Sequence, residues 1–161
     1  APIIAGFASR CGASRQDIDD LVQDVMTALL AQPDFRYDPG RGRFRSFLKT
    51  ITVRAAIRRA GKNLRFQGVP LDQLDDVAIA VEPLWNDLWE QELIAQGLRV
   101  VRMENADSLA FRAFEQYVLL DRPAEDVAAE LNTSVNNVHQ AKSRITRMLR
   151  EAVQRLRQQE P

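Results

Sequence analysis

Residues 123–153 read PAEDVAAELNTSVNNVHQAKSRITRMLREAV within a chain of 161 residues. The spacing of the apolar residues predicts a short helix over 123–131, a tight turn, and a longer helix from 135 to about 158 that crosses the first. Asn132 is expected in the left-handed conformation of the turn, because Asn is the best choice for it after Gly. Ser134 is expected to cap the longer helix. The stretch therefore predicts a helix-turn-helix bundle.

The apolar residues of both helices fall on single faces. Pro123 is expected at the first helical position, Val127 and Leu131 face inward, and Ala128 lets the longer helix approach closely. On the longer helix the apolar residues that recur at about 100° per residue are Val138, Ala141, Ile145, Met148, Leu149, Ala152 and Leu156. This pattern is typical of two amphipathic helices that share a core.

The opposite face of the longer helix carries amide, hydroxyl, imidazole and guanidinium groups. Amides and guanidinium groups read base edges in the major groove, and cationic groups also neutralise phosphate. The candidate DNA-binding residues are Asn136, Asn137, His139, Gln140, Ser143, Arg144 and Arg147. The alternative is a solvated face without a ligand, and the turn spacing favours DNA recognition over it.

The remaining chain also has helical periodicity. Helices are expected over about 15–32, after a sequence that resembles a capping box, and over about 44–60. Periodicity resumes near Leu84, and Asp107 or Ser108 is expected to cap a further helix. No segment has a convincing strand pattern. The prediction is an all-α fold of two small helical domains joined by a linker.

Gly, Pro and Asp residues interrupt the periodicity between the two halves of the chain. We therefore predict an N-terminal domain over 1–68, an acidic linker over 69–83 and a C-terminal domain over 84–161. The chain starts inside an apolar run, and we expect a native helix there to begin before Ala1. Trp85 and Trp89 are expected to be core residues rather than base-stacking platforms.

The chain is neutral as a whole, yet its charges are segregated. Residues 1–70 carry a net charge of +6, residues 71–107 a net charge of −7 and residues 108–161 a net charge of +1. Attraction to phosphate acts within a Debye length of about 8 Å, so the local charge matters more than the total. Overall neutrality therefore does not exclude a nucleic-acid partner.

Several classes of protein are disfavoured by composition. One cysteine, Cys11, excludes an internal disulfide, and with a single histidine it leaves no metal or cofactor site to expect. No apolar run reaches the about 18 residues of a membrane span, and the N-terminus does not resemble a signal peptide. The sequence shows neither a nucleophile paired with a general base nor a Gly-rich phosphate-binding loop, so it does not indicate an enzyme. We expect a cytoplasmic protein without catalysis and without membrane insertion.

Two stretches, DIDDLVQDVMTALL (17–30) and FRYDPGRGRFRSFLKTI (35–51), resemble domain two of bacterial sigma factors of the extracytoplasmic-function group. The chain is also similar to domain four of that family over AFEQYVLLDRPAEDVAAELNTSVNNV (113–138). Two linked motifs in the family's order are more specific than either alone. The chain departs from the family pattern at Phe47, where Trp is usual, and at Arg54 and Arg58, where many members have Asn and Asp.

The resemblance implies a sigma factor that binds core RNA polymerase and recognises promoter DNA. It implies docking on the clamp helices of the largest subunit through Asp20, Gln23, Asp24 and Thr27. It implies contact with the −10 element through Arg41, Arg43, Arg45, Lys49, Arg54, Arg58 and Arg59. The DNA-binding face of the last helix would then read the −35 element. The arginines are favoured over Phe44 and Phe47 as DNA contacts, because both rings also fall on the core stripe of their helix.

The resemblance also implies the flap of the second-largest polymerase subunit as a partner. An anti-sigma protein is common in the family, although no residue here identifies one. The alternative function is a helix-turn-helix regulator that binds operator DNA without polymerase, and such a protein is usually a dimer on symmetric half-sites. That alternative does not need the basic segment at 38–62.

Overall fold

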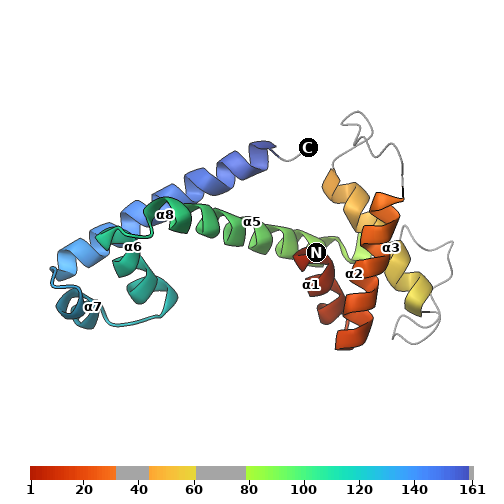
Figure 1. The fold of residues 1–161 in the computed structure, drawn as a ribbon, viewed down its shortest axis with the longest axis horizontal. Helices are drawn as coiled ribbons and strands as arrows, with labels where there is room; N and C mark the ends of the chain where they lie inside the picture. Colours follow the sequence, from red (N-terminus) through yellow and green to blue (C-terminus); the bar gives the residue numbers. More distant parts are fainter. Residues whose placement is uncertain (32–43, 61–78, 160–161) are drawn as a thin grey trace. The chain divides into compact units, whose positions relative to one another are not determined.

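The computed structural model describes residues 1–31, 44–60 and 79–159, which form helices and turns without any strand. The all-α prediction is confirmed. The described elements are α1 (Pro2–Arg10), α2 (Arg15–Leu30), α3 (Phe44–Ala60), α5 (Glu82–Asn105), α6 (Leu109–Phe114), the π-helix η3 (Glu115–Leu119), α7 (Ala124–Glu130) and α8 (Val135–Gln159) (Figure 1). They belong to two compact units, Ala1–Glu92 and Leu93–Glu160.

The long predicted helices are present close to their expected limits. Most of the predicted linker, 69–83, lies outside the described residues, so the predicted domain limits stay a prediction. The turns of α5 up to Glu92 belong to the first unit, although the sequence assigned residues from 84 onward to the C-terminal domain. This part of α5 belongs to the first unit because the Trp85 side chain is fully buried in the core of that unit.

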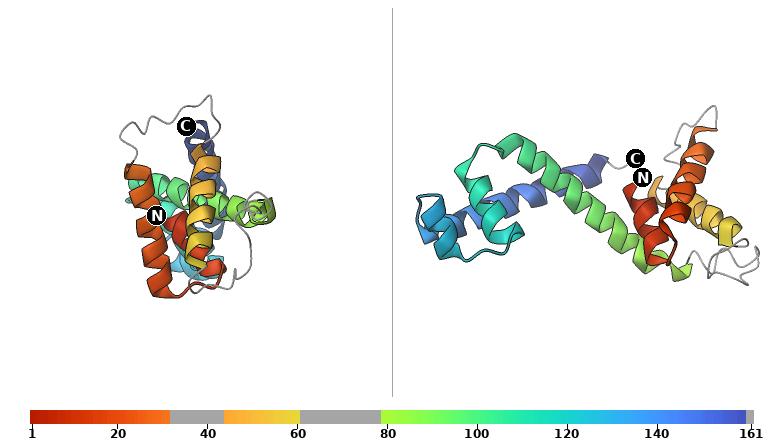
Figure 2. Two further views of the ribbon diagram at one scale, coloured as in Figure 1. Left: turned by 90° about the vertical axis from the view of Figure 1, so that its right-hand side faces the viewer. Right: turned by 60° about the horizontal axis from the view of Figure 1, so that its bottom comes forward.

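The first unit is built on α1, α2 and α3, of which α2 contacts both of the others (Figures 1 and 2). α2 begins at Arg15 because the Ser14 hydroxyl accepts a hydrogen bond of 3.2 Å from the Asp17 backbone N–H. Its apolar face is buried along Leu21 and Val25. Met26 and Leu30 of the same helix are exposed.

The core of the first unit centres on Trp85. Its ring meets the ring of Phe7 edge to face, with centroids 5.8 Å apart, and both side chains are almost completely buried. Ile4 and Val25 are also buried. Trp89 is buried as well, which confirms that both tryptophans are core residues.

α3 is buried over a wider surface than the single stripe predicted from its sequence. Leu48, Thr52 and Ala55 lie on one face of α3 and are buried, and so are Val53 and Ile57. The reason is that α3 packs on α2 and also makes side-chain contacts with α5. The buried Thr52 hydroxyl donates to the Leu48 carbonyl at 2.8 Å, so its polar atom is satisfied within the helix.

In the second unit, the Ser108 hydroxyl caps α6 by accepting from the Phe111 N–H at 3.0 Å, which identifies Ser108 rather than Asp107 as the cap. The helix continues as η3, which the sequence did not predict. The backbone then turns through Asp121, whose φ is 52°. Arg122 holds this turn by contacting Glu130 of α7 at 2.6 Å.

α7 and α8 form the predicted pair, with α7 beside the N-terminal end of α8 (Figure 2). Asn132 has a φ of 51°, and the Ser134 hydroxyl accepts from the Asn137 N–H at 3.1 Å, so both turn predictions are confirmed. Pro123 is the residue before the helix rather than its first residue, because its ψ of 139° is extended. Val127 and Val138 are fully buried in the core cluster that the two helices share.

Gly97 marks a close approach of α5 to α8 in the second unit. A Cβ atom at this position would lie 2.8 Å from Val153 Cγ2 and 3.1 Å from Leu149 Cδ1. We predict that Gly97→Ala lowers the free energy of unfolding by about 1 to 2 kcal/mol, because the clash outweighs the helix propensity gained. Urea unfolding measures the effect. The double variant Gly97→Ala, Val153→Ala removes the clashing methyl group, and a cost no smaller than the sum of the single costs would contradict the packing explanation.

Candidate functional site

A groove between α2 and α3 gathers residues of both predicted N-terminal sites. It has a volume of about 570 Å³ and is lined by Gln23, Asp24, Thr27, Ala28, Ala31, Ala55, Arg58 and Arg59. Its lining combines three alanines with acidic, amide, hydroxyl and basic side chains. The sequence predicted these polar residues as two separate sites, and the structure brings five of them to one groove.

Arg59 connects the two helices across this groove. Its Nε atom donates to Asp24 Oδ2 at 2.6 Å, and its Nη1 atom donates to Asp20 Oδ2 at 3.2 Å. Asp20 and Asp24 are four residues apart and so lie on one face of α2. The three side chains are 29%, 46% and 48% exposed for Arg59, Asp20 and Asp24, so solvent reaches the cluster. One cation thus binds two of the four predicted docking residues.

The hydrogen bond and the charge of Arg59 lower the pKa of Asp24 below its usual value. A carboxylate with a lowered pKa in the folded state stabilises the fold above its unfolded pKa of about 3.9 and loses that contribution as the pH falls through the lower folded value. We therefore predict that Asp24→Ala loses less stability than the wild type between pH 5 and pH 2. Urea unfolding at both pH values checks this, and equal losses in the two proteins would contradict it.

The other described basic residues of α3 divide into two groups. Arg45 donates a hydrogen bond to Asn86 and lies over the Trp89 ring at 5.5 Å, and Lys49 pairs with Glu82. Their charged groups therefore bind α5, which the sequence did not predict because these partners are 33 or more residues away in the chain.

Arg54 and Arg58, by contrast, are exposed on α3. Their spacing of four residues places them on one face of the helix. Arg41 and Arg43, also predicted to contact DNA, lie outside the described residues. The described part of the predicted DNA-binding segment thus presents two arginines to solvent and uses Arg45, Lys49 and Arg59 in contacts within the unit.

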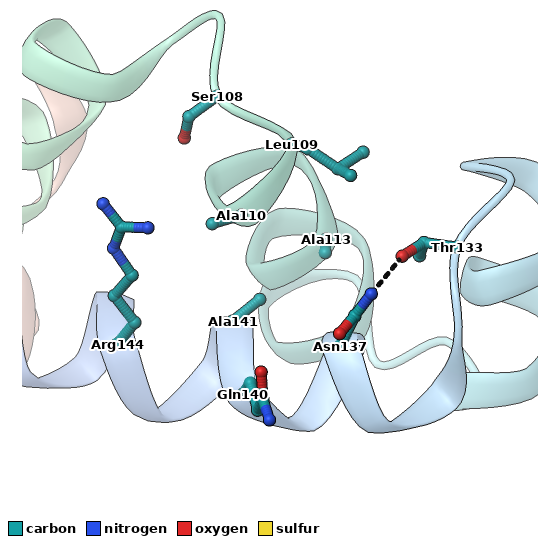
Figure 3. Close-up of a pocket in the computed structure, with 9 residues that line it drawn as sticks. All are labelled: Ser108, Leu109, Ala110, Ala113, Thr133, Asn137, Gln140, Ala141 and Arg144. Atoms are coloured by element: carbon teal, nitrogen blue, oxygen red, sulfur yellow. Dashed lines mark hydrogen bonds between the residues drawn. The ribbon is translucent and has the colours of Figure 1, made fainter.

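All seven candidate DNA-binding residues of α8 are exposed: Asn136, Asn137, His139, Gln140, Ser143, Arg144 and Arg147. Three of them, Asn137, Gln140 and Arg144, line a groove of about 350 Å³ against α6 (Figure 3). In Figure 3 the Asn137 amide donates to the Thr133 hydroxyl at 3.0 Å, which orients it at the turn. The predicted recognition face is therefore accessible.

Tyr117 of η3 contributes a contact that the sequence did not predict. Its ring meets the His139 ring edge to face with centroids 5.4 Å apart, and Lys142 Nζ lies 5.6 Å from its centre. Lys142 was not among the candidate residues, although it is exposed and lies next to them on α8. Its position three residues after His139 on the predicted helix could have identified Lys142 as a candidate.

Comparison with known protein families gives a match in the N-terminal part of the chain. Residues 1–66 match the family model for sigma-70 region 2. Over these residues the chain is similar to sigma-70 region 2. The match supports a sigma-factor role in promoter recognition and RNA polymerase binding, and sigma-70 proteins are transcription initiation factors rather than enzymes. Searches of curated proteins and of solved structures found no match.

The sigma-70 region 2 match contains α1, α2 and α3, and therefore every lining residue of the groove between α2 and α3. The candidate residues of α8 lie outside the match, so their assignment depends on the geometry of the second unit. Within the described residues, no group of three His, Cys, Asp or Glu side chains is placed to hold a metal ion. In the same residues, no helix combines the length and apolar character needed to cross a membrane.

Proposed function

We propose that this protein is a sigma factor of the extracytoplasmic-function group that binds core RNA polymerase and directs it to promoters. The observation that carries the proposal is the groove within the sigma-70 region 2 domain, where Gln23, Asp24 and Thr27 face solvent beside small side chains. Exposed carboxylates attract basic partner residues, and the small residues leave room for a partner helix. This surface, with Asp20, docks on the clamp helices of the largest subunit.

The −10 element is contacted by the basic segment around α3. Arg54 and Arg58 follow the phosphate backbone, and Arg41 and Arg43, which precede α3 in the sequence, extend the contact. Backbone contacts of this kind fix the position of the protein on DNA without reading its sequence. Arg45 and Lys49 support the contact by fastening α3 to α5 through Asn86 and Glu82.

The −35 element is read by the exposed face of α8, the second helix of the helix-turn-helix. Asn136, Gln140 and Ser143 offer amide and hydroxyl groups to base edges, and Arg144 and Arg147 bind phosphate or guanine. Support comes from the left-handed Asn132 and the cap at Ser134, which hold the turn between α7 and α8. Tyr117 positions His139 at the edge of this face.

The partners are core RNA polymerase, including the flap of the second-largest subunit, and promoter DNA. The sigma factor acts in the cytoplasm without a cofactor or catalysis of its own, and an anti-sigma protein is a further expected partner. The alternative, an operator-binding regulator, does not explain why the sigma-70 region 2 domain is present.

Reconstituted transcription tests the proposal. The full chain is added to core RNA polymerase on a library of genomic promoter fragments, and transcript starts are mapped by sequencing. We expect new starts at a common distance from shared −35 and −10 sequences. The absence of protein-dependent starts from every fragment would contradict the proposed function. The Arg54→Gln variant is expected to reduce transcription while leaving polymerase binding intact, since Arg54 is exposed on α3 and does not line the groove between α2 and α3.

A further inference from the structure

Arg59 belongs to the helix that is proposed to contact DNA, but its guanidinium group points to the polymerase-docking face. Its Nε and Nη1 atoms donate to Asp24 and Asp20 on α2. The next residue back, Arg58, lines the same groove and is exposed. Arg59 therefore belongs to the helix of the proposed DNA-binding surface and contacts the carboxylates of the proposed polymerase-docking surface.

We propose that Arg59 couples polymerase docking to DNA binding, because the carboxylates that hold it in the free protein are those that the polymerase takes. When basic groups of the polymerase pair with Asp20 and Asp24, Arg59 is released and its guanidinium binds a DNA phosphate beside Arg58. This inference rests on the proposed function.

Electrostatics explains why the free state disfavours DNA at this position. Two carboxylates and one guanidinium form a cluster with a net charge of −1, which repels a phosphate. The pKa of Arg59 is raised and that of Asp24 is lowered by their contact, so both of these groups stay ionised near neutral pH. Once basic groups of the polymerase pair with the two acids, the positive charge of Arg59 is available to a phosphate.

The exposure of the cluster makes such an exchange feasible. Asp24 is 48% exposed, and ion pairs in contact with water contribute little to stability because water solvates the separated charges. A partner cation can therefore replace Arg59 without opening the core. A fully buried pair would resist this exchange, since removing one partner leaves an uncompensated charge away from water.

The first experiment measures DNA binding by the free protein, without polymerase. Anisotropy of a labelled mixed-sequence single strand of about 20 nucleotides reports the dissociation constant for four proteins: wild type, Asp24→Ala, Asp19→Ala and Arg59→Gln. Asp19 is an exposed acid on the same helix, so its replacement gives the same change in charge without releasing Arg59. We expect Asp24→Ala to bind about 3- to 5-fold more tightly than Asp19→Ala, as one additional phosphate contact provides.

The salt dependence and a double variant identify the source of the gain. One additional contact on a single strand steepens the plot of log K against log salt by about 0.7, and Asp24→Ala should show this increase relative to Asp19→Ala. In Asp24→Ala, Arg59→Gln, the gain should disappear. Equal affinities of Asp24→Ala and Asp19→Ala, or a gain that persists without Arg59, would overturn the proposal.

The second experiment compares the free protein with the holoenzyme. Arg59→Gln should weaken promoter binding by the holoenzyme about 3- to 10-fold and DNA binding by the free protein by a smaller factor, because in the free protein the local charge changes but no phosphate contact is lost. Equal effects in both forms would overturn the coupling. Failure of the proposed function has a different signature: wild-type protein does not bind core polymerase, whatever the result with free protein and single-stranded DNA.

Discussion

Replacing Trp85 with Ala is expected to lower the free energy of unfolding of the first unit by about 3 to 5 kcal/mol, the typical cost of truncating a buried Trp. Trp85 is fully buried, and its ring contacts Phe7 edge to face. Truncation leaves a cavity between α1 and α5 and removes the ring contact. Urea unfolding followed by circular dichroism gives the value.

A conservative variant separates packing from hydrogen bonding. The indole Nε1 atom of Trp85 is buried and has no hydrogen-bond partner among the described residues. Trp85→Phe keeps an aromatic ring and removes this unsatisfied donor, whose burial is unfavourable by about 1 to 3 kcal/mol. We therefore expect Phe to cost less than half as much as Ala. Equal losses of unfolding free energy in Trp85→Phe and Trp85→Ala would contradict the packing role of the ring.

Asp24→Arg is expected to raise the dissociation constant for core RNA polymerase about 30-fold, which corresponds to about 2 kcal/mol. The substitution replaces an exposed carboxylate in the groove between α2 and α3 with a cation. A basic partner surface is then repelled instead of attracted. Because the new side chain also faces Arg59, the thermal midpoint of unfolding must be measured beside the affinity.

Asp19→Arg is the matched control, since it makes the same change of charge on the same helix outside the groove. We expect it to change the dissociation constant less than about 3-fold at 0.15 M salt, because Asp19 does not line the groove and salt screens its exposed charge. A similar loss of affinity in both variants would show that only the net charge of α2 affects polymerase binding. It would contradict the proposal that the groove is the docking site.

The parts of the fold that depend on local sequence could be predicted. Ser14, Asn132 and Ser134 act through backbone groups only a few residues away, so their roles followed from turn and cap chemistry. The buried faces of α7 and α8 followed from the spacing of their apolar residues. Helices with one buried face and a polar terminus are the most predictable elements in such a chain.

The contacts between distant segments could not be predicted. The pairs of Arg59 with Asp24 and of Lys49 with Glu82 join residues 33 or more apart, and they depend on how the helices are oriented. Likewise, Val53 and Ile57 are buried because α3 has neighbours on two sides, which a single apolar stripe does not indicate. η3 also escaped prediction, since its sequence is compatible with an ordinary α-helix.

The candidate sites show the same division. The exposure of the α8 residues agreed with their periodicity, whereas the basic residues of α3 separated into exposed and internally bound groups only in the folded structure. Arg54 and Arg58 remained available to a ligand, while Arg45 binds Asn86. Residue type predicted the kind of partner, and packing determined which residues can reach it.

Equilibrium binding of the full chain to core RNA polymerase is the most direct test of the proposed sigma function. We predict saturable binding with one protein per core enzyme, weakened about 30-fold in Asp24→Arg and less than about 3-fold in Asp19→Arg. The contradicting result is a folded wild-type protein that does not bind core polymerase but binds duplex operator DNA tightly by itself, which is the behaviour of a helix-turn-helix regulator.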